Sequence, residues 1–279
     1  MITLNDVSFA YSKKKEVFSN LNLTLEPGSI YGLLGKNGAG KTTLLKMMCG
    51  LAAPSSGSCT TLGEKAARKS PSLMRELFFL PEEFYMPDMQ IKKFVSLNAP
   101  FYPAFDLNQF HRYLDEFEIN PESRLRSLSY GEKKKVMIGF GIATNTKLLL
   151  FDEPTNGLDI PSKRQFRRIM ASIANEDKCI IISTHQVRDL ETLIDHLVIL
   201  HNNRILLNEN VGVITQKLCF KTVQTVADNQ GILYSESSLK GHNILLKNAE
   251  QEDSQLDMEL LFNGVQHCPE KINHLFNLN

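Results

Sequence analysis

The chain has 279 residues, of which 42% are hydrophobic and 22% charged, as is typical of a folded protein with a substantial core. Its 31 basic and 31 acidic residues give a net charge of zero, so composition indicates no general attraction to nucleic acid or to an anionic membrane surface. The five cysteines are scattered without CxxC spacing, which argues against a disulfide framework or a zinc site and favours a reducing compartment.

Strand-like and helix-like segments alternate along the first 210 residues. Apolar residues at alternating positions predict strands within residues 1–34, and a helix is expected over residues 41–49. Aromatic residues, prolines and short helical patterns predict a small helical subdomain at about residues 82–145. Further elements are predicted as a strand at 148–151, a helix from Pro161, a strand at 180–183, a helix marked by Val187 through Leu197, and a hairpin around 201–203. This alternation predicts a parallel α/β sheet.

The pattern weakens in residues 211–279. Short strands are expected within residues 218–247, and residues 258–276 have a helical pattern. No motif that carries chemistry stands out in this part of the chain. We therefore expect a small α+β appendage that packs on the preceding domain or aids dimerisation.

The most informative run is residues 35–43, which match the pattern GxxxxGKS/T between a predicted strand and a predicted helix. Its glycines let successive backbone N–H groups turn toward phosphate oxygens, and the following helix offers its positive N-terminal end. Lys41 would neutralise the β and γ phosphates, and the Thr42 hydroxyl would bind Mg²⁺. The nucleotide-binding residues predicted from this run are Gly35, Asn37, Gly38, Ala39, Gly40, Lys41, Thr42 and Thr43. By itself the run predicts a nucleoside triphosphate site, which a kinase, a GTPase or a transporter ATPase would all contain.

Two acidic residues follow the apolar run Leu148–Phe151, written with the next two residues as LLLFDE. They come at the carboxyl end of a predicted buried strand, which is where doubly wound sheets bind ligands. Asp152 is therefore expected to hold Mg²⁺, and Glu153 to polarise the water that attacks the γ phosphate.

Four segments together resemble ABC-type ATPase cassettes, over about residues 1–210. They are residues 35–43, the LSYGE segment at 128–132, the DEPTNGLD segment at 152–159 and the STH segment at 183–185, in that order and spacing. The resemblance implies a P-loop NTPase fold of the α/β class. It implies a parallel-sheet core, an N-terminal antiparallel β subdomain and the small helical subdomain, with residues 211–279 as the appendage.

The resemblance also implies a head-to-tail dimer that holds two ATP molecules between its subunits. Ser129 and Gly131 would contact the γ phosphate bound to the phosphate loop of the other subunit, and Asp159 would organise the dimer seam. His185 would contact the γ phosphate and hold the attacking water. Tyr11 would stack on the adenine ring, although an ordinary core or surface aromatic is the alternative.

Two positions depart from the family pattern. Glu82 stands where the family commonly carries a glutamine that touches Mg²⁺, and a carboxylate there still suits Mg²⁺ while adding negative charge. In the signature segment, usually LSGGQ, Tyr130 replaces the first glycine and Glu132 replaces the glutamine. We expect the backbone of Tyr130 to avoid positive φ.

The main functional prediction is an ATPase subunit that powers an ABC transporter, of a kind similar to ABC-2 exporters. Its expected partners are a separate transmembrane permease and a second cassette, identical or not, and no nucleic acid. The groove near residues 82–94, with Phe84 and Tyr85, would receive a cytoplasmic helix of the permease, although both aromatics could be ordinary core. Because the sequence has no signal-peptide pattern and no apolar run of about 20 residues, we expect a cytoplasmic protein on the inner face of the membrane.

Two alternatives remain open at this point. A soluble ABC-type ATPase acting on ribosomes or DNA would share these motifs, but the single phosphate loop and the neutral charge argue against it. A weakly hydrolysing nucleotide switch would suit Glu82 and Tyr130. The presence of both Glu153 and His185 argues against that reading.

Overall fold

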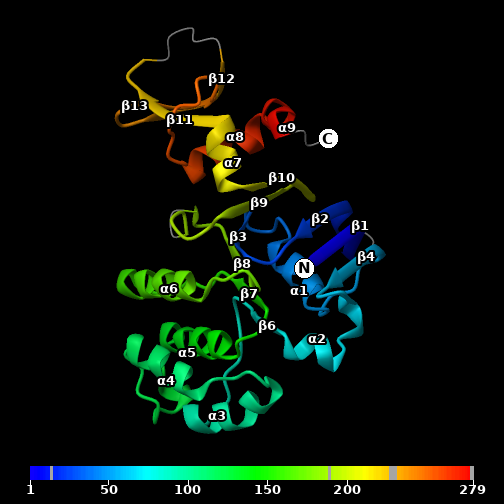
Figure 1. Ribbon diagram of the computed structural model, residues 1–279, viewed down its shortest axis with the longest axis vertical. Coiled ribbons are helices and arrows are strands. Elements are labelled where there is room, and N and C mark those ends of the chain that lie inside the picture. Colours follow the sequence, from blue (N-terminus) through cyan, green and yellow to red (C-terminus); the bar gives the residue numbers. More distant parts are fainter. Residues whose placement is uncertain (13–14, 188–189, 226–230, 277–279) are drawn as a thin grey trace.

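The computed structural model describes residues 1–12, 15–187, 190–225 and 231–276 (Figure 1). Within these ranges, no helix has both the length and the apolar character needed to span a membrane.

A six-stranded sheet forms the centre of the molecule, with the strand order β10-β9-β3-β8-β7-β6. Its strands are β3 (Ser29–Leu34), β6 (Leu77–Leu80), β7 (Leu148–Asp152), β8 (Cys179–Thr184), β9 (His196–His201) and β10 (Arg204–Asn210). Neighbouring strands are parallel except β9 and β10, which form the predicted hairpin. The predicted parallel α/β core is therefore confirmed.

The two faces of the central sheet bury different residues of the same strands. Leu149 and Phe151 of β7 belong to one apolar core, which also contains side chains of α5 (Tyr130–Ala143) and α6 (Ile160–Ile173). Leu148 and Leu150 belong to a second core with α1 (Lys41–Met48) and the N-terminal sheet. Because both faces are covered, the strand reads as a continuous apolar run instead of an alternating one.

The N-terminal sheet has the strand order β2-β1-β4-β5, and all its pairs are antiparallel. Its strands are β1 (Ile2–Ser12), β2 (Lys15–Leu25), β4 (Ser56–Thr61) and β5 (Glu64–Lys65), followed by the short helices η1 (Ala66–Arg68) and α2 (Pro71–Arg75). The predicted antiparallel β subdomain is therefore present beside α1 (Figure 1).

Short helices lie between β6 and β7 and form the lower end of the molecule in Figure 1. They are α3 (Ile91–Asn98), η2 (Ala99–Phe101), α4 (Leu107–Glu116) and η3 (Leu125–Ser127), which lead into α5. Phe140 of α5 lies at their centre, with its ring centroid 5.4 Å from that of Phe94 and 5.0 Å from that of Phe105. This aromatic core explains why the segment is rich in phenylalanine.

The C-terminal segment lies at the opposite end of the molecule (Figure 1). It begins with α7 (Val211–Lys217), continues with the sheet β11-β13-β12, and ends with two helices. The strands are β11 (Leu218–Val223), β12 (Ile232–Ser238) and β13 (Gly241–Lys247), and the helices are α8 (Met258–His267) and α9 (Pro269–Phe276). Within residues 218–276, strands and helices thus occur where the sequence predicted them, while the domain boundaries near residues 82, 145 and 210 stay predictions.

The helix predicted from Val187 to Leu197 is wrong. Leu193 donates a backbone hydrogen bond to the carbonyl of Leu190 at 2.9 Å within a turn, and Leu197 is buried in β9. The leucines are buried as their spacing suggested, but a turn and a strand bury them, not one helix face. Residues 188–189 of this stretch lie outside the described residues.

The predicted hairpin joins β9 and β10 through two asparagines. Asn202 and Asn203 have φ values of 45° and 66°. Two consecutive left-handed residues give the turn that matches the twist of paired strands, and asparagine tolerates this conformation better than most residues.

Candidate functional site

A cavity of about 420 Å³ opens where the loop after β3 meets the carboxyl ends of β7 and β8. It is lined by Tyr11, Val17, Lys36, Asn37, Gly38, Gly40, Lys41, Thr42, Thr43, Glu82, Asp152, Glu153, Asn156 and His185. Segments far apart in the sequence meet here because parallel strands end at the same edge of the sheet.

The loop backbone takes the shape that its glycines allow. Gly38 and Gly40 have φ values of 82° and 106°, and a Cβ on Gly40 would approach the ring of Phe18 to 2.8 Å. Lys41 begins α1 and turns its side chain back over the loop, where Nζ donates to the carbonyl of Gly35 at 2.8 Å. Ala39 donates its backbone N–H to the Lys36 carbonyl at 3.0 Å, so Gly35 and Ala39 support the loop without lining the cavity.

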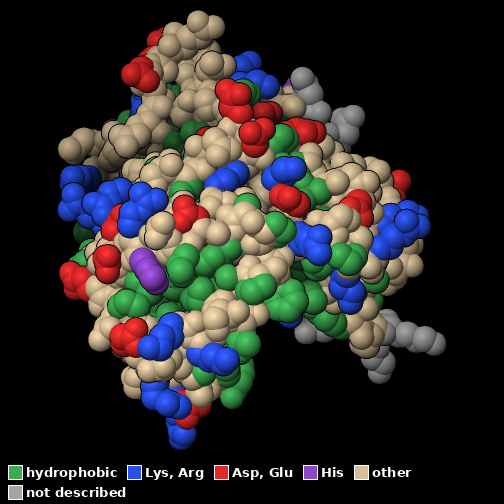
Figure 2. Space-filling model, turned by 60° about the horizontal axis from the view of Figure 1, so that its bottom comes forward, with side chains coloured by type: hydrophobic (Ala, Val, Ile, Leu, Met, Phe, Trp, Pro, Cys, Tyr) green, Lys and Arg blue, Asp and Glu red, His purple; other side chains and the backbone are tan. Residues whose placement is uncertain are grey.

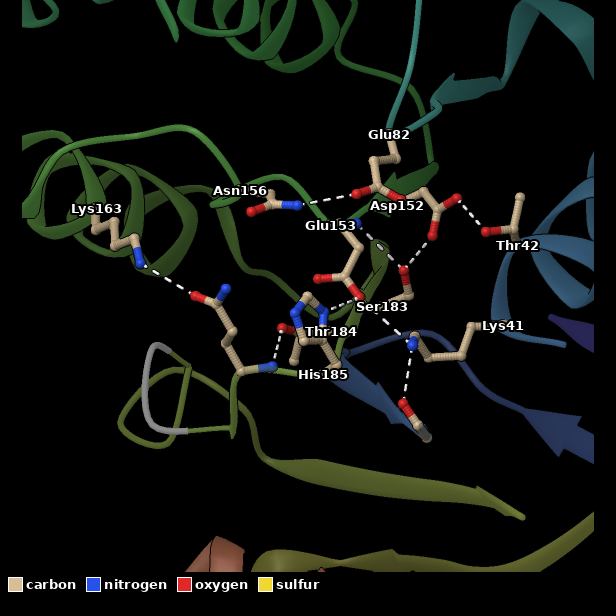
Figure 3. A network of polar contacts seen from close by, with 12 residues as sticks. Lys41, Thr42, Glu82, Asp152, Glu153, Asn156, Lys163, Ser183, Thr184 and His185 are labelled. Carbon is tan, nitrogen blue, oxygen red and sulfur yellow. Dashed lines mark hydrogen bonds and ion pairs between the residues drawn. The ribbon is translucent and has the colours of Figure 1, made fainter. Parts of the chain in front are cut away.

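Asp152 ends β7 and receives two hydroxyl groups. Thr42 Oγ1 donates to Asp152 Oδ2 at 2.6 Å, and Ser183 Oγ donates to Asp152 Oδ1 (Figure 3). Ser183 lies opposite Asp152 in the register of β7 and β8. The Thr42 and Asp152 oxygens are hard donors of the type that Mg²⁺ prefers, and Mg²⁺ usually takes one or two carboxylates together with substrate phosphates. This fits a nucleotide site better than a cage of protein ligands, and the described residues hold no group of three or more His, Cys, Asp or Glu suited to a metal ion.

Glu153 is a nearly fully buried carboxylate with two cationic or titratable neighbours. Its Oε1 lies 2.8 Å from His185 Nδ1 and 3.4 Å from Lys41 Nζ (Figure 3). The backbone of Glu153 has φ of 48°, a left-handed conformation that is uncommon for a residue with a side chain. Of the three predicted catalytic residues, Lys41 and His185 therefore both contact Glu153.

Glu82 enters the cavity from the segment after β6. Its Oε1 accepts a hydrogen bond from Asn156 Nδ2 at 2.9 Å (Figure 3). Asn156 was not predicted as a site residue, although it lies within the DEPTNGLD segment that carried the resemblance. An amide beside Glu82 links the strand-to-helix junction with the loop after β7.

Tyr11 lies at the mouth of the cavity and is 57% exposed. Its hydroxyl shares a hydrogen bond with Thr43 Oγ1 at 2.9 Å, and its ring packs edge-on against Phe9 at 4.9 Å. An exposed ring fixed at its edge leaves a face for a planar ligand, and its stacking on adenine stays a prediction.

Ser129, Gly131 and Asp159 do not line this cavity. Ser129 caps α5, since its Oγ accepts from the backbone of Glu132 at 3.2 Å while the Glu132 carboxylate accepts from the Ser129 N–H at 2.8 Å. These hydrogen bonds hold the pKa of Glu132 below its ordinary value. Tyr130 is the first residue of α5 and has no positive φ, as expected.

Two close contacts define the segments that carry Gly131 and Asp159. Asp159 caps α6 by accepting from the Ser162 N–H at 2.8 Å, which lowers the pKa of Asp159. A Cβ on Gly131 would come within 2.8 Å of the Gly157 carbonyl, so α5 can approach the loop after β7 only with a glycine there.

Lys134 is the main contact that sequence reasoning missed. It has no exposed surface, and Nζ donates to the carbonyls of Glu153 at 2.9 Å and Asn156 at 3.0 Å. Its place in a run of three lysines, residues 133–135, gave no signal, because such runs normally face solvent.

Comparisons with known proteins agree with this architecture. The family model described as ABC transporter matches residues 18–156. The ABC transporter ATP-binding protein YtrB of Bacillus subtilis is 30% identical over 208 residues, which cover 74% of this chain and 70% of the relative. The bacitracin transport ATP-binding protein BcrA of Bacillus licheniformis is 32% identical over 211 residues, covering 74% of this chain and 68% of the relative.

Solved structures show the same fold. An ATP-binding subunit of an ABC transporter superposes with a TM-score of 0.69 at 26% identity, covering 77% of this chain and 92% of that one. A dimeric ATP-binding cassette in a post-hydrolysis state, bound to ADP and Pi, superposes with a TM-score of 0.68 at 20% identity over 76% of this chain and 99% of that one, and shows the fold alone. On the family match, the relatives and the nucleotide-binding architecture, this chain belongs to the ABC transporter family, as an ATP-binding and ATP-hydrolysing subunit.

Proposed function

We propose that the 420 Å³ cavity is where this subunit binds and hydrolyses ATP, with Glu153 as the base that orients the attacking water. The buried contact of the Glu153 carboxylate with Lys41 and His185 carries this proposal. A base must lie within hydrogen-bond reach of the water, and the Glu153 carboxylate lies directly after β7, beside the phosphate loop.

The loop N–H groups and Lys41 bind the β and γ phosphates, with α1 directed toward the same anion. When the ammonium group of Lys41 pairs with bound phosphate, the Glu153 carboxylate loses its contact with Lys41 and can accept a hydrogen bond from the water. His185 continues to hold the Glu153 carboxylate in place. Thr42 and Asp152 would hold Mg²⁺, with Glu82 as a third oxygen donor at the edge of the cavity. Held there, the ion would supply positive charge to offset the negative charge of the phosphates.

A second cassette completes each site. Ser129 and Gly131 lie at the start of α5, outside the cavity of their own subunit, which suits residues that meet a nucleotide held by the other subunit. Asp159 lies at the start of α6, directly after the loop that Gly131 approaches. Hydrolysis then changes the contact between subunits, which couples ATP turnover to opening of the dimer.

A separate transmembrane permease docks on the apolar face formed beside the short helices. Hydrophobic side chains gather there (Figure 2). A second cavity of about 450 Å³ is lined by Cys49, Leu51, Pro71, Met74, Arg75, Leu77, Phe79, Phe101 and Tyr102. Leu51 and Phe101 are 61% and 69% exposed, which suits a cytoplasmic helix of the permease. A subunit docked in this way would lie at the cytoplasmic face of the membrane.

The predicted docking groove near residues 82–94 stays a prediction. Tyr85 is 87% exposed, whereas Phe84 stacks on Tyr130 within the subunit, with the ring centroids 5.9 Å apart.

Relatives named for Nod factor export support a cargo that leaves the cell. Co-purification of a multi-span membrane protein from detergent-solubilised membranes would support the permease, and recovery with ribosomes or DNA would contradict it.

The test of the site is Glu153→Gln, which keeps the shape of the side chain and removes its basicity. ATP binding should be retained, turnover should fall by about a hundredfold or more, and an ATP-bound dimer should accumulate in size-exclusion chromatography. Glu176→Gln, which changes an exposed carboxylate, serves as the control and should keep wild-type turnover. Wild-type turnover of Glu153→Gln would remove Glu153 from the role of base.

A further inference from the structure

Lys134 is a fully buried lysine that the ATPase site as described above does not use. Burying an ammonium group is unfavourable unless it is paired and hydrogen-bonded. Lys134 has 0% exposure, and its Nζ is satisfied by two backbone carbonyls, those of Glu153 and Asn156. Both carbonyls belong to the loop that follows β7, so one side chain of α5 ties down the loop that carries the catalytic carboxylate.

Several groups around Lys134 partly offset the cost of burying its charge. Its Nζ lies 5.1 Å from the centre of the Tyr130 ring, one turn earlier on the same helix. The hydroxyl of Tyr130 in turn donates to the backbone carbonyl of Glu82. Burial lowers the pKa of Lys134, and the nearby carboxylates of Glu82, Glu153 and Asp152 oppose that shift.

Glu153 needs such support because its backbone is strained. A left-handed conformation is uncommon in a residue with a side chain and persists only where the surroundings hold it. The Glu153 N–H donates to the Ser183 carbonyl at 3.1 Å, and the Glu153 carbonyl accepts from Lys134. The peptide groups on both sides of the Glu153 Cα are thus fixed, one by β8 and one by α5.

We propose that Lys134 is a positioning residue that holds the Glu153 carboxylate in its hydrolytic orientation and links it to the signature segment at the start of α5. The inference rests on the proposed role of Glu153 as the base. Ser129, at the N-terminus of the same helix, is proposed to meet the nucleotide of the other subunit. A shift of α5 on engagement of that nucleotide therefore reaches the base of this subunit's own site through a direct hydrogen bond.

Lys134→Met tests the proposal, because methionine keeps the length of the side chain and loses its donors. We expect kcat to fall about ten- to a hundredfold, since small displacements of a catalytic group have effects of this size, while the Kd for ATP stays within about twofold. Lys134→Gln keeps an N–H donor and should recover part of kcat. Lys133→Met, at the neighbouring and only partly buried lysine, should keep wild-type kcat and Kd.

Thermal unfolding of each variant separates positioning from a purely structural role. A structural role would lower Tm in Lys134→Met and Lys134→Gln but leave kcat per folded molecule at the wild-type value, and that result would overturn the proposal. If Lys134→Met does not fold, Lys134→Gln carries the test, with a severalfold lower kcat expected. Wild-type kcat in the Lys134 variants, together with an inactive Glu153→Gln, would contradict the role of Lys134 and leave the role of Glu153 intact. An active Glu153→Gln would contradict the assignment of Glu153 as the base.

Discussion

The nucleotide site and the C-terminal segment bury very different side chains. Around the site the chain buries Lys41 at the start of α1, Lys134 in α5, and Asp152, Glu153 and Ser183 at the carboxyl ends of β7 and β8. In the described part of residues 211–276, Asn248 is the one polar side chain in the buried class, and the rest of that core is apolar or cysteine. Buried charge is unfavourable for folding, so its concentration at one sheet edge indicates where chemistry, not stability, shaped the sequence.

The polar exception in the C-terminal segment is itself structural. Asn248 Nδ2 donates to the carbonyls of Thr215 at 3.0 Å and Glu252 at 2.9 Å, and its Oδ1 accepts from the Glu252 N–H. The side chain thereby joins the end of β13 to α7 and leaves no donor directed at a cavity. This contrast predicts that substitutions in the C-terminal segment change stability, whereas matched substitutions at the site change ATP binding or turnover.

The largest expected effect on stability comes from Leu245→Ala. Leu245 is fully buried in the central strand β13, and it packs so closely on α8 that a Cβ on Gly264 would lie 2.8 Å from its Cδ2. Loss of this side chain should lower the free energy of unfolding by about 3–4 kcal/mol in urea titrations, with kcat per folded molecule unchanged. Leu239→Ala, at a fully exposed leucine, is the control. A folded Leu245→Ala protein without ATPase activity would contradict the prediction that substitutions in the C-terminal segment change stability and not turnover.

Lys41→Ala should change ATP binding more than stability, the opposite of the result expected for Leu245→Ala. The ammonium group of Lys41 lines the cavity at the start of α1 and lies beside Glu153, so its loss should weaken ATP binding about a hundredfold, or about 2.7 kcal/mol. Binding of a fluorescent ATP analogue measures this change. Lys46→Ala, in the last turn of the same helix, should bind ATP as the wild type does. Unchanged affinity of Lys41→Ala would contradict the assignment of the phosphate loop.

The smallest effects compare two helix caps with the same local role. Ser129 caps α5 and Asp257 caps α8, each through a side-chain oxygen that accepts a backbone N–H. Substitution of either by alanine should lower the free energy of unfolding by about 1 kcal/mol. Only Ser129→Ala should also lower ATP turnover, measured at saturating ATP as phosphate release. Equal turnover in the two variants would show that the Ser129 hydroxyl serves the helix and not the nucleotide.

Local sequence patterns were sufficient for elements whose residues are neighbours in the chain. The strand, glycine-rich loop and helix around residues 29–48 and the hairpin with Asn202 and Asn203 follow from short-range backbone preferences. The same patterns failed between Val187 and Leu197, because periodic burial of leucines does not distinguish a helix face from a turn followed by a strand.

The residues of the site also differ in whether local sequence patterns could predict their roles. The phosphate loop and the two acids at the end of β7 could be predicted from contiguous residues, since each motif supplies its own backbone geometry and charge. The roles of Asn156 and Lys134 could not be predicted in this way, because each depends on a partner from another segment. Asn156 contacts the carboxylate of Glu82, and Lys134 contacts the carbonyls of Glu153 and Asn156. A lysine in a charged run is solvated unless the fold surrounds it with acceptors, and only packing of α5 against the loop after β7 provides them here.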